Sequence, residues 1–167
     1  MKRIVRVAAM MAIAVAVGAC VTQARSYTMY AGDGVQQVFV RPFEVSEGDL
    51  QASFDITAQF QDLDVHGDAT INFSVYSSSS FSLSDTPDVV LAISMDEVPL
   101  QDVTLLFRDS ERGVVRYSSR VPSDAFRRLL DDVDDVLISF SWQTIHEDDI
   151  ASPALRDRLR LLAGHVE

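Results

Sequence analysis

The chain has 167 residues, a length typical of one domain, and a formal net charge of −11. Residues 1–20 contribute +3, which leaves −14 for residues 21–167, a region without lysine whose charge excludes nucleic acids and anionic lipid headgroups as expected partners. Cys20 is the only cysteine, so no disulfide forms within the chain.

The N-terminus has the pattern of an export signal. Lys2, Arg3 and Arg6 precede Val7–Ala19, an uninterrupted run of 13 small and apolar residues. As a helix this run would span about 20 Å, which is shorter than the roughly 30 Å hydrocarbon core of a bilayer. The segment is therefore typical of the apolar part of a signal peptide and not of a membrane span.

The residues Val17-Gly18-Ala19-Cys20 resemble the lipobox of bacterial lipoproteins. The resemblance implies removal of residues 1–19, a diacylglyceryl group on the Cys20 thiol and an acylated new N-terminus. By the same resemblance, Val21 in place of aspartate directs the protein to the outer membrane, facing the periplasm. Residues 20–26 then form a tether and residues 27–167 one domain. The alternative is an ordinary secretory signal in which Cys20 is incidental.

Alternating side chains predict most of the remaining structure. From Leu50 to Phe60 the even positions are apolar and the odd positions polar, which predicts a strand with one buried face. The pattern resumes over residues 69–75, so the two segments predict an antiparallel hairpin around Asp62–Asp68. Further strands are expected over Val35–Arg41 (stopped by Pro42), Val89–Met95, Val103–Arg108, Val114–Val121 and Val136–Gln143.

Two helices are expected among these strands. Ser123 is positioned to cap a helix that runs through Asp132. The second helix has Ser152 at its cap, Pro153 at its first position and Gly164 after its end. The sequence therefore predicts a mostly β fold with seven or eight strands, an antiparallel β-sandwich-like sheet domain with two short helices (α+β).

The segment Asp62–Asp68 partly resembles a calcium loop, because Asp62, Asp64 and Asp68 alternate with other residues and Gly67 permits a sharp turn. His66 and the absence of a glutamate at the twelfth position depart from that pattern. A polar hairpin loop explains the same residues without a metal. These aspartates are weak candidates only, and no metal or other cofactor is expected.

No catalytic motif is visible. Nucleophile-elbow, phosphate-loop and paired-histidine zinc patterns are missing from the sequence, and residues 21–167 contain no cysteine or lysine nucleophile. The acidic segments 131–135 and 146–149 are expected to be solvated helix-end and loop residues. A hydrolase would need a cleft that holds His66 or His146 beside a carboxylate.

These observations favour a lipid-anchored, non-enzymatic cell-envelope protein that binds or scaffolds another envelope component. The alternative is a periplasm-facing domain that binds a small ligand or a divalent cation. The apolar stripe of the last helix, which includes Leu155 and Leu159, is expected to pack against the sheet and is otherwise a docking face for a partner.

Overall fold

The computed structural model describes residues 26–76, 87–93, 96–143 and 145–166. The predicted fold class is confirmed, because these residues form two antiparallel sheets and two helices. The described part contains eleven strands, more than the seven or eight expected. Cys20 and the remainder of the signal and tether through residue 25 lie outside the described residues, as does Met95, the expected end of one strand.

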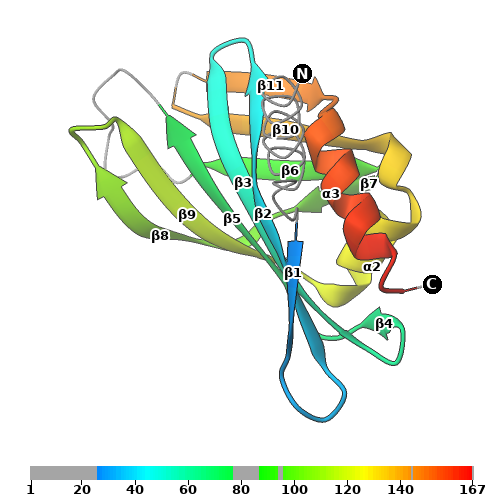
Figure 1. The fold of residues 1–167 in the computed structure, drawn as a ribbon. Coiled ribbons are helices and arrows are strands. Elements are labelled where there is room, and N and C mark those ends of the chain that lie inside the picture. The colour runs from blue at the N-terminus through cyan, green and yellow to red at the C-terminus, as the bar shows by residue number, and fades with distance from the viewer. Residues whose placement is uncertain (1–25, 77–86, 94–95, 144, 167) are drawn as a thin grey trace, which may run out of the picture.

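The larger sheet has seven strands in the order β1-β2-β3-β5-β9-β8, with β4 paired to β3. Figure 1 shows β1 and β8 at its two edges. Its members are β1 (Ser26–Tyr30), β2 (Gln36–Glu47), β3 (Leu50–Gln61), β4 (Asp64–Val65), β5 (Ala69–Tyr76), β8 (Gln101–Asp109) and β9 (Val114–Val121).

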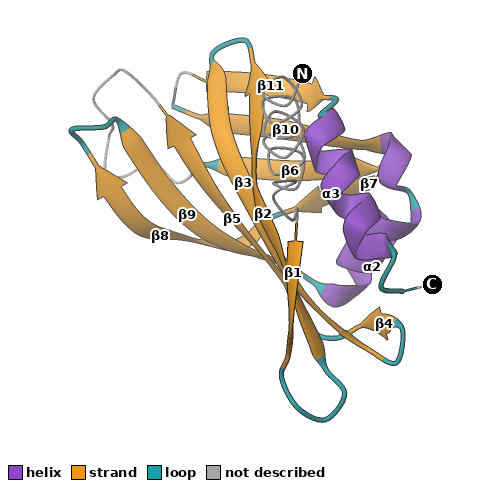
Figure 2. Ribbon diagram, in the orientation of Figure 1, coloured by secondary structure: helices purple, strands orange, loops and turns teal. Residues whose placement is uncertain are grey.

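The smaller sheet has four strands in the order β11-β10-β6-β7. Its members are β6 (Asp88–Ile93), β7 (Asp96–Pro99), β10 (Val136–Trp142) and β11 (Ile145–Ile150). Together with helices α2 (Ser123–Asp131) and α3 (Pro153–Ala163), it lies on one side of the larger sheet (Figure 2). A short 3-10 turn, η1 (Val133–Asp135), connects α2 to β10.

The hydrophobic core lies between the two sheets. Phe73 of β5 meets Phe140 of β10 edge to face, with ring centroids 6.4 Å apart. Tyr117 of β9 meets Trp142 of β10 in the same way at 6.1 Å. Aromatic pairs of this geometry stabilise a core beyond the area that they bury. Trp142 is buried in this core.

Strand β2 corrects the prediction that Pro42 ends the strand. The strand continues to Glu47, and its register against β3 shifts between Val40 and Phe43, where Arg41 and Pro42 stand. A proline cannot donate a ladder hydrogen bond, and a bulge is one of the few places in a sheet that accepts it.

The expected capping of the first helix by Ser123 is wrong. Ser123 is the first helical residue, and Pro122, which holds the cap position, makes no side-chain capping hydrogen bond. The Ser123 N–H instead donates to the Asp68 carboxylate at 3.2 Å. In α3 the expected cap is confirmed, because the Ser152 hydroxyl accepts a hydrogen bond from the Leu155 N–H at 3.2 Å.

The apolar stripe of α3 packs within the domain. Leu155, Leu159 and Leu162 are all buried in the core. They are therefore unavailable to a partner, and the docking alternative for this stripe is wrong. None of the helices in the described ranges is both long enough and apolar enough to cross a membrane.

Residues 146–149 form most of strand β11, which corrects the expectation of an acidic loop. Glu147 reaches across to the turn between β2 and β3, where its carboxylate accepts a hydrogen bond from the Asp49 N–H at 3.0 Å. Gly48 in this turn has a φ of 49°, and a Cβ there would overlap the Glu147 carboxylate. The glycine therefore permits both the turn and the contact between the sheets.

Candidate functional site

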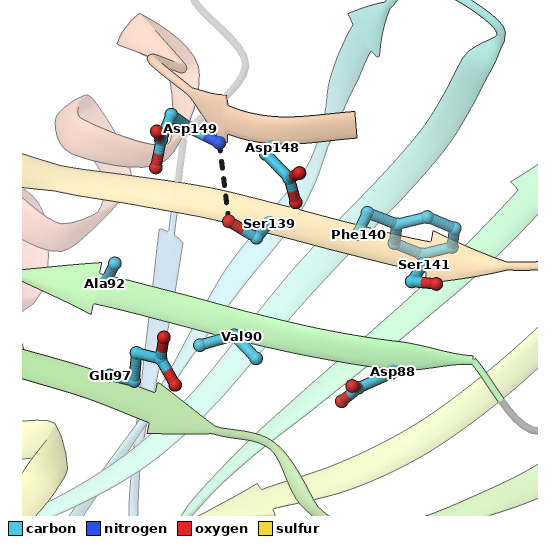
Figure 3. Close-up of a pocket in the computed structure, with 9 residues that line it drawn as sticks. All are labelled: Asp88, Val90, Ala92, Glu97, Ser139, Phe140, Ser141, Asp148 and Asp149. Carbon is cyan, nitrogen blue, oxygen red and sulfur yellow. Dashed lines mark hydrogen bonds between the residues drawn. The ribbon is translucent and has the colours of Figure 1, made fainter. Parts of the chain in front are cut away.

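A shallow acidic depression lies on the outward face of the smaller sheet (Figure 3). Its volume is about 530 Å³. It is lined by Asp88, Val90, Ala92, Glu97, Ser139, Phe140, Ser141, Asp148 and Asp149. These residues come from all four strands, and most of them are at positions that point away from the core, whereas the Phe140 side chain is buried in the core.

The carboxylates of the depression do not converge. Figure 3 shows Asp88 and Glu97 far apart on β6 and β7, with Asp148 and Asp149 across the floor on β11. Within the ranges that the structure describes, no group of three or more His, Cys, Asp or Glu residues is arranged to hold a metal ion. The depression can attract cations by its charge, but it does not present a coordination shell.

Ser141 and His146 form the nearest approach to a nucleophile and base. The Ser141 hydroxyl and His146 Nδ1 hydrogen-bond at 2.8 Å. The two residues stand directly opposite each other in the β10–β11 hairpin, so their proximity follows from strand register. Among the described residues no carboxylate hydrogen-bonds to His146, which is exposed. Within the described part of the chain, this pair is therefore a hydrogen bond between neighbouring strands without a carboxylate to orient the imidazole.

The structure does not bring the three candidate calcium ligands together into a site. Asp62 lies in a left-handed turn with Leu63. Asp64 forms an ion pair with Arg127 and accepts a hydrogen bond from the Val65 N–H at 2.8 Å. Asp68 instead faces the N-terminus of α2 and Arg120. Two of the three carboxylates thus have protein partners already.

The arginines of α3 are used within the domain. The Arg156 Nε–H donates to the Val136 carbonyl at 3.3 Å. Arg160 pairs with Asp134 and Asp157, and the hydrogen bond to Asp134 raises its pKa. The hydrogen bond to Asp102 likewise raises the pKa of Arg120. Both arginines remain charged at any physiological pH, and their ion pairs are exposed and weak.

The outer face of the larger sheet carries a mostly buried polar network. Asp55 on β3 pairs with Arg116 on β9 across β5. The second Asp55 oxygen accepts a hydrogen bond from Asn72 Nδ2 at 2.8 Å, and Arg116 Nη1 donates to the Ser74 hydroxyl at 3.0 Å. The network satisfies its own charges and links three strands, so its role is structural.

We expect Asp55→Ala to lower the free energy of unfolding by about 2 kcal/mol, because it leaves the Arg116 guanidinium largely buried without its carboxylate. Urea denaturation followed by circular dichroism measures this loss. The matched control is Asp96→Ala, which breaks the exposed pair with Arg128 and should cost less than about 0.5 kcal/mol. Equal losses in the two variants would contradict a stabilising role for the network.

The free edge of β8 carries a run of exposed apolar side chains. Leu105, Leu106 and Phe107 are consecutive large apolar residues, and they are 47%, 52% and 49% exposed. β8 pairs only with β9, so the backbone groups on its other side have no strand partner within the described residues. We refer to these three residues on this edge strand as the β8 edge.

Most proteins protect such an edge with charged residues, prolines or bulges. The register of β8 against β9 shifts twice, once between Gln101 and Thr104 and once between Leu105 and Phe107. These irregularities increase the local twist, but the three apolar side chains still face solvent. Sequence reasoning predicted the strand and missed this surface, although the run Leu105–Phe107 lacks the alternation that is seen in β3 and β5.

Comparison of this chain with protein-family models, with curated proteins and with solved structures finds no match. The interpretation of the acidic depression and of the β8 edge therefore depends on their geometry and chemistry.

Proposed function

We propose that this chain is a lipid-anchored, non-enzymatic cell-envelope protein that binds another envelope protein through the β8 edge. The observation that carries the proposal is the exposed apolar run of an edge strand that has no second neighbouring strand among the described residues. An edge of this kind accepts an extended segment of a partner, which adds a strand to the sheet by main-chain hydrogen bonds. Apolar side chains of that segment would cover Leu105, Leu106 and Phe107.

In this proposal, the lipid on Cys20 determines where in the cell envelope the domain is located. The lipobox-like residues through Cys20 support attachment to the outer membrane on its periplasmic side. Two or three acyl chains hold a protein on a membrane stably, whereas one chain holds it only marginally. A protein held in this way meets its envelope partner in two dimensions, which raises their effective concentration.

A photo-crosslinking amino acid in place of Leu106 tests the proposed contact in intact cells. We expect one adduct of defined mass, whose partner is identified by mass spectrometry. The matched control is the same amino acid at Leu161, which is exposed on α3, far from the β8 edge in sequence and fold, and should give no such adduct. A common adduct pattern at both positions, or no adduct at Leu106, would contradict the proposal.

Phe107→Glu provides the energetic test. Covering the exposed half of this ring contributes about 2 kcal/mol, so its replacement should weaken the complex about 30-fold and remove most of the adduct at Leu106. Leu161→Glu should leave the adduct yield unchanged. An adduct with twice the mass of the chain would mean that the partner is a second copy and would contradict a heterologous partner.

The acidic depression favours a second candidate function, the binding of a small cationic ligand or a divalent cation in the periplasm. Its spread-out carboxylates give this candidate less support than the β8 edge gives to protein binding.

A further inference from the structure

The covalent chain limits how far the domain can lie from a lipid on Cys20. Six residue steps separate Cys20 from Ser26, where β1 begins. A fully extended chain spans at most about 3.5 Å per residue, so Ser26 lies within about 20 Å of the lipidated cysteine. A lipid anchor therefore keeps the start of β1 close to the bilayer surface.

β1 exposes the side chains that suit such a position. Tyr27, Met29 and Tyr30 are 53%, 56% and 77% exposed. The Tyr27 ring stacks on Phe39 of β2, with centroids 4.7 Å apart and an angle of 9° between the rings. Tyrosine rings favour the interface between lipid headgroups and acyl chains, because they are apolar with a polar tip.

The positions beside these residues on the sheet are uncharged. Strand register places Tyr27 beside Phe39, and Phe39 beside Thr57 of β3. The next row on the same face consists of Met29, Gln37 and Gln59. On β1, β2 and β3 an approaching bilayer would thus desolvate no charge in these rows, which avoids the largest cost of such a contact. The first row reaches a charged residue only two strands further on, at Arg120 of β9.

Arg41 adds a group that fits lipid phosphates. It is exposed, it follows Val40, and Val40 pairs with Ser26 at the start of β1. Within the described ranges the structure gives Arg41 no ion pair, whereas the arginines at positions 112, 116, 120, 127, 128 and 160 each pair with a carboxylate. A guanidinium without a carboxylate partner is a strong donor to phosphate oxygens.

The distribution of charge along the chain favours the same orientation. Arg25, Arg41 and Asp33 are the only charged residues of segment 21–43, which therefore carries +1, and residues 44–167 carry −15. The acidic part is repelled by lipid phosphates and the first segment is not. This asymmetry favours an orientation with β1 toward the bilayer and the acidic remainder away from it.

We infer, on the basis of the proposed anchor at Cys20, that β1 and the adjoining part of β2 form the membrane-facing surface of the domain. Tyr27, Met29 and Phe39, which share one face of the sheet, contact the interface of a zwitterionic bilayer, and Arg41 binds its phosphates. The lipid thus fixes the orientation of the domain as well as its location.

The experiment uses the full chain, lipidated in a bacterium and reconstituted into phosphatidylcholine–phosphatidylethanolamine vesicles. Because Cys20 is the only cysteine and its thiol carries the lipid in this proposal, Met29→Cys introduces a unique site for an environment-sensitive fluorophore. Doxyl-labelled phosphatidylcholine in the vesicles quenches a fluorophore that touches the bilayer. The matched control is Leu106→Cys, which has similar exposure on the opposite edge strand.

We expect quenching at least about twofold stronger at position 29 than at position 106, and weaker quenching at position 29 after Arg41→Glu is added. Equal quenching at both positions, with the acyl groups confirmed by intact mass, would overturn the orientation and leave the anchor intact. An unmodified Cys20 would overturn both. Binding at the β8 edge is measured separately by cross-linking, so its failure would not affect this result.

Discussion

We expect Cys20→Ala to release the chain from bacterial membranes into the soluble fraction. In the wild type we expect the loss of residues 1–19 and a mass gain that matches a diacylglyceryl or triacyl modification. Each buried methylene contributes about 0.8 kcal/mol to membrane binding, so two or three acyl chains hold almost every molecule on the bilayer. The variant has no thiol for the lipid, and its distribution between fractions should reverse.

Intact mass spectrometry and membrane fractionation measure this change. Val21→Ala, which keeps the lipobox-like residues and the cysteine, is the control and should remain in the membrane fraction. A soluble wild type, cut elsewhere and with an unmodified cysteine, would mean that residues 1–19 form an ordinary secretory signal. The chain would then be a freely diffusing periplasmic or secreted protein.

Phe73→Ala should lower the free energy of unfolding by about 3–5 kcal/mol, a large part of the stability of a domain of this size. Phe73 is fully buried, and its ring lies 5.4 Å from Tyr117 and 5.7 Å from Phe54 in its own sheet. It also meets Phe140 of the opposite sheet. The substitution therefore leaves a cavity where the two sheets are joined.

Urea denaturation measures this loss, and Phe107→Ala is the matched control. Both variants remove a phenyl ring from the larger sheet, but the ring of Phe107 is half exposed. We expect the control to cost less than about 1 kcal/mol, as is usual for surface positions. Similar losses in the two variants would mean that the junction between the sheets does not determine the stability of the domain.

Strands with regular alternation were predictable from sequence. The bounds expected for β9 are those observed, β10 ends one residue before the expected Gln143, and the polar and apolar positions of β3 lie on the expected faces. In such strands local side-chain pattern and tertiary burial agree, since every second residue meets the core.

Strand β11 escaped prediction because a bulge breaks its alternation. Ile145 and Ile150 are both buried, although an odd number of steps separates them. One extra residue of β11 faces β10 between the pairs of Ile138 and Phe140, and Asp149 has a φ of 54° there. This insertion returns Ile150 to the core face, and no local sequence pattern predicts it.

The candidate site was partly visible in sequence and partly not. The run Leu105–Phe107 can be read directly from the sequence, but its exposure depends on the place of β8 in the sheet. That place results from pairing between segments far apart in the chain, which periodicity does not specify. The acidic residues are easier to recognise in the sequence than this apolar run. They say less about the candidate site, because several of them pair with arginines of the same domain.

The strand order also determines the distance between β1 and β8. β1 and β8 stand at opposite edges of the larger sheet, five inter-strand steps apart. With neighbouring strands about 4.8 Å apart, the edges are separated by about 24 Å along the sheet. In a lipid-anchored chain, this width determines how far from its tether the domain can hold a partner. Longer loops would leave that reach unchanged, whereas a gained or lost pair of strands would alter it by about 10 Å.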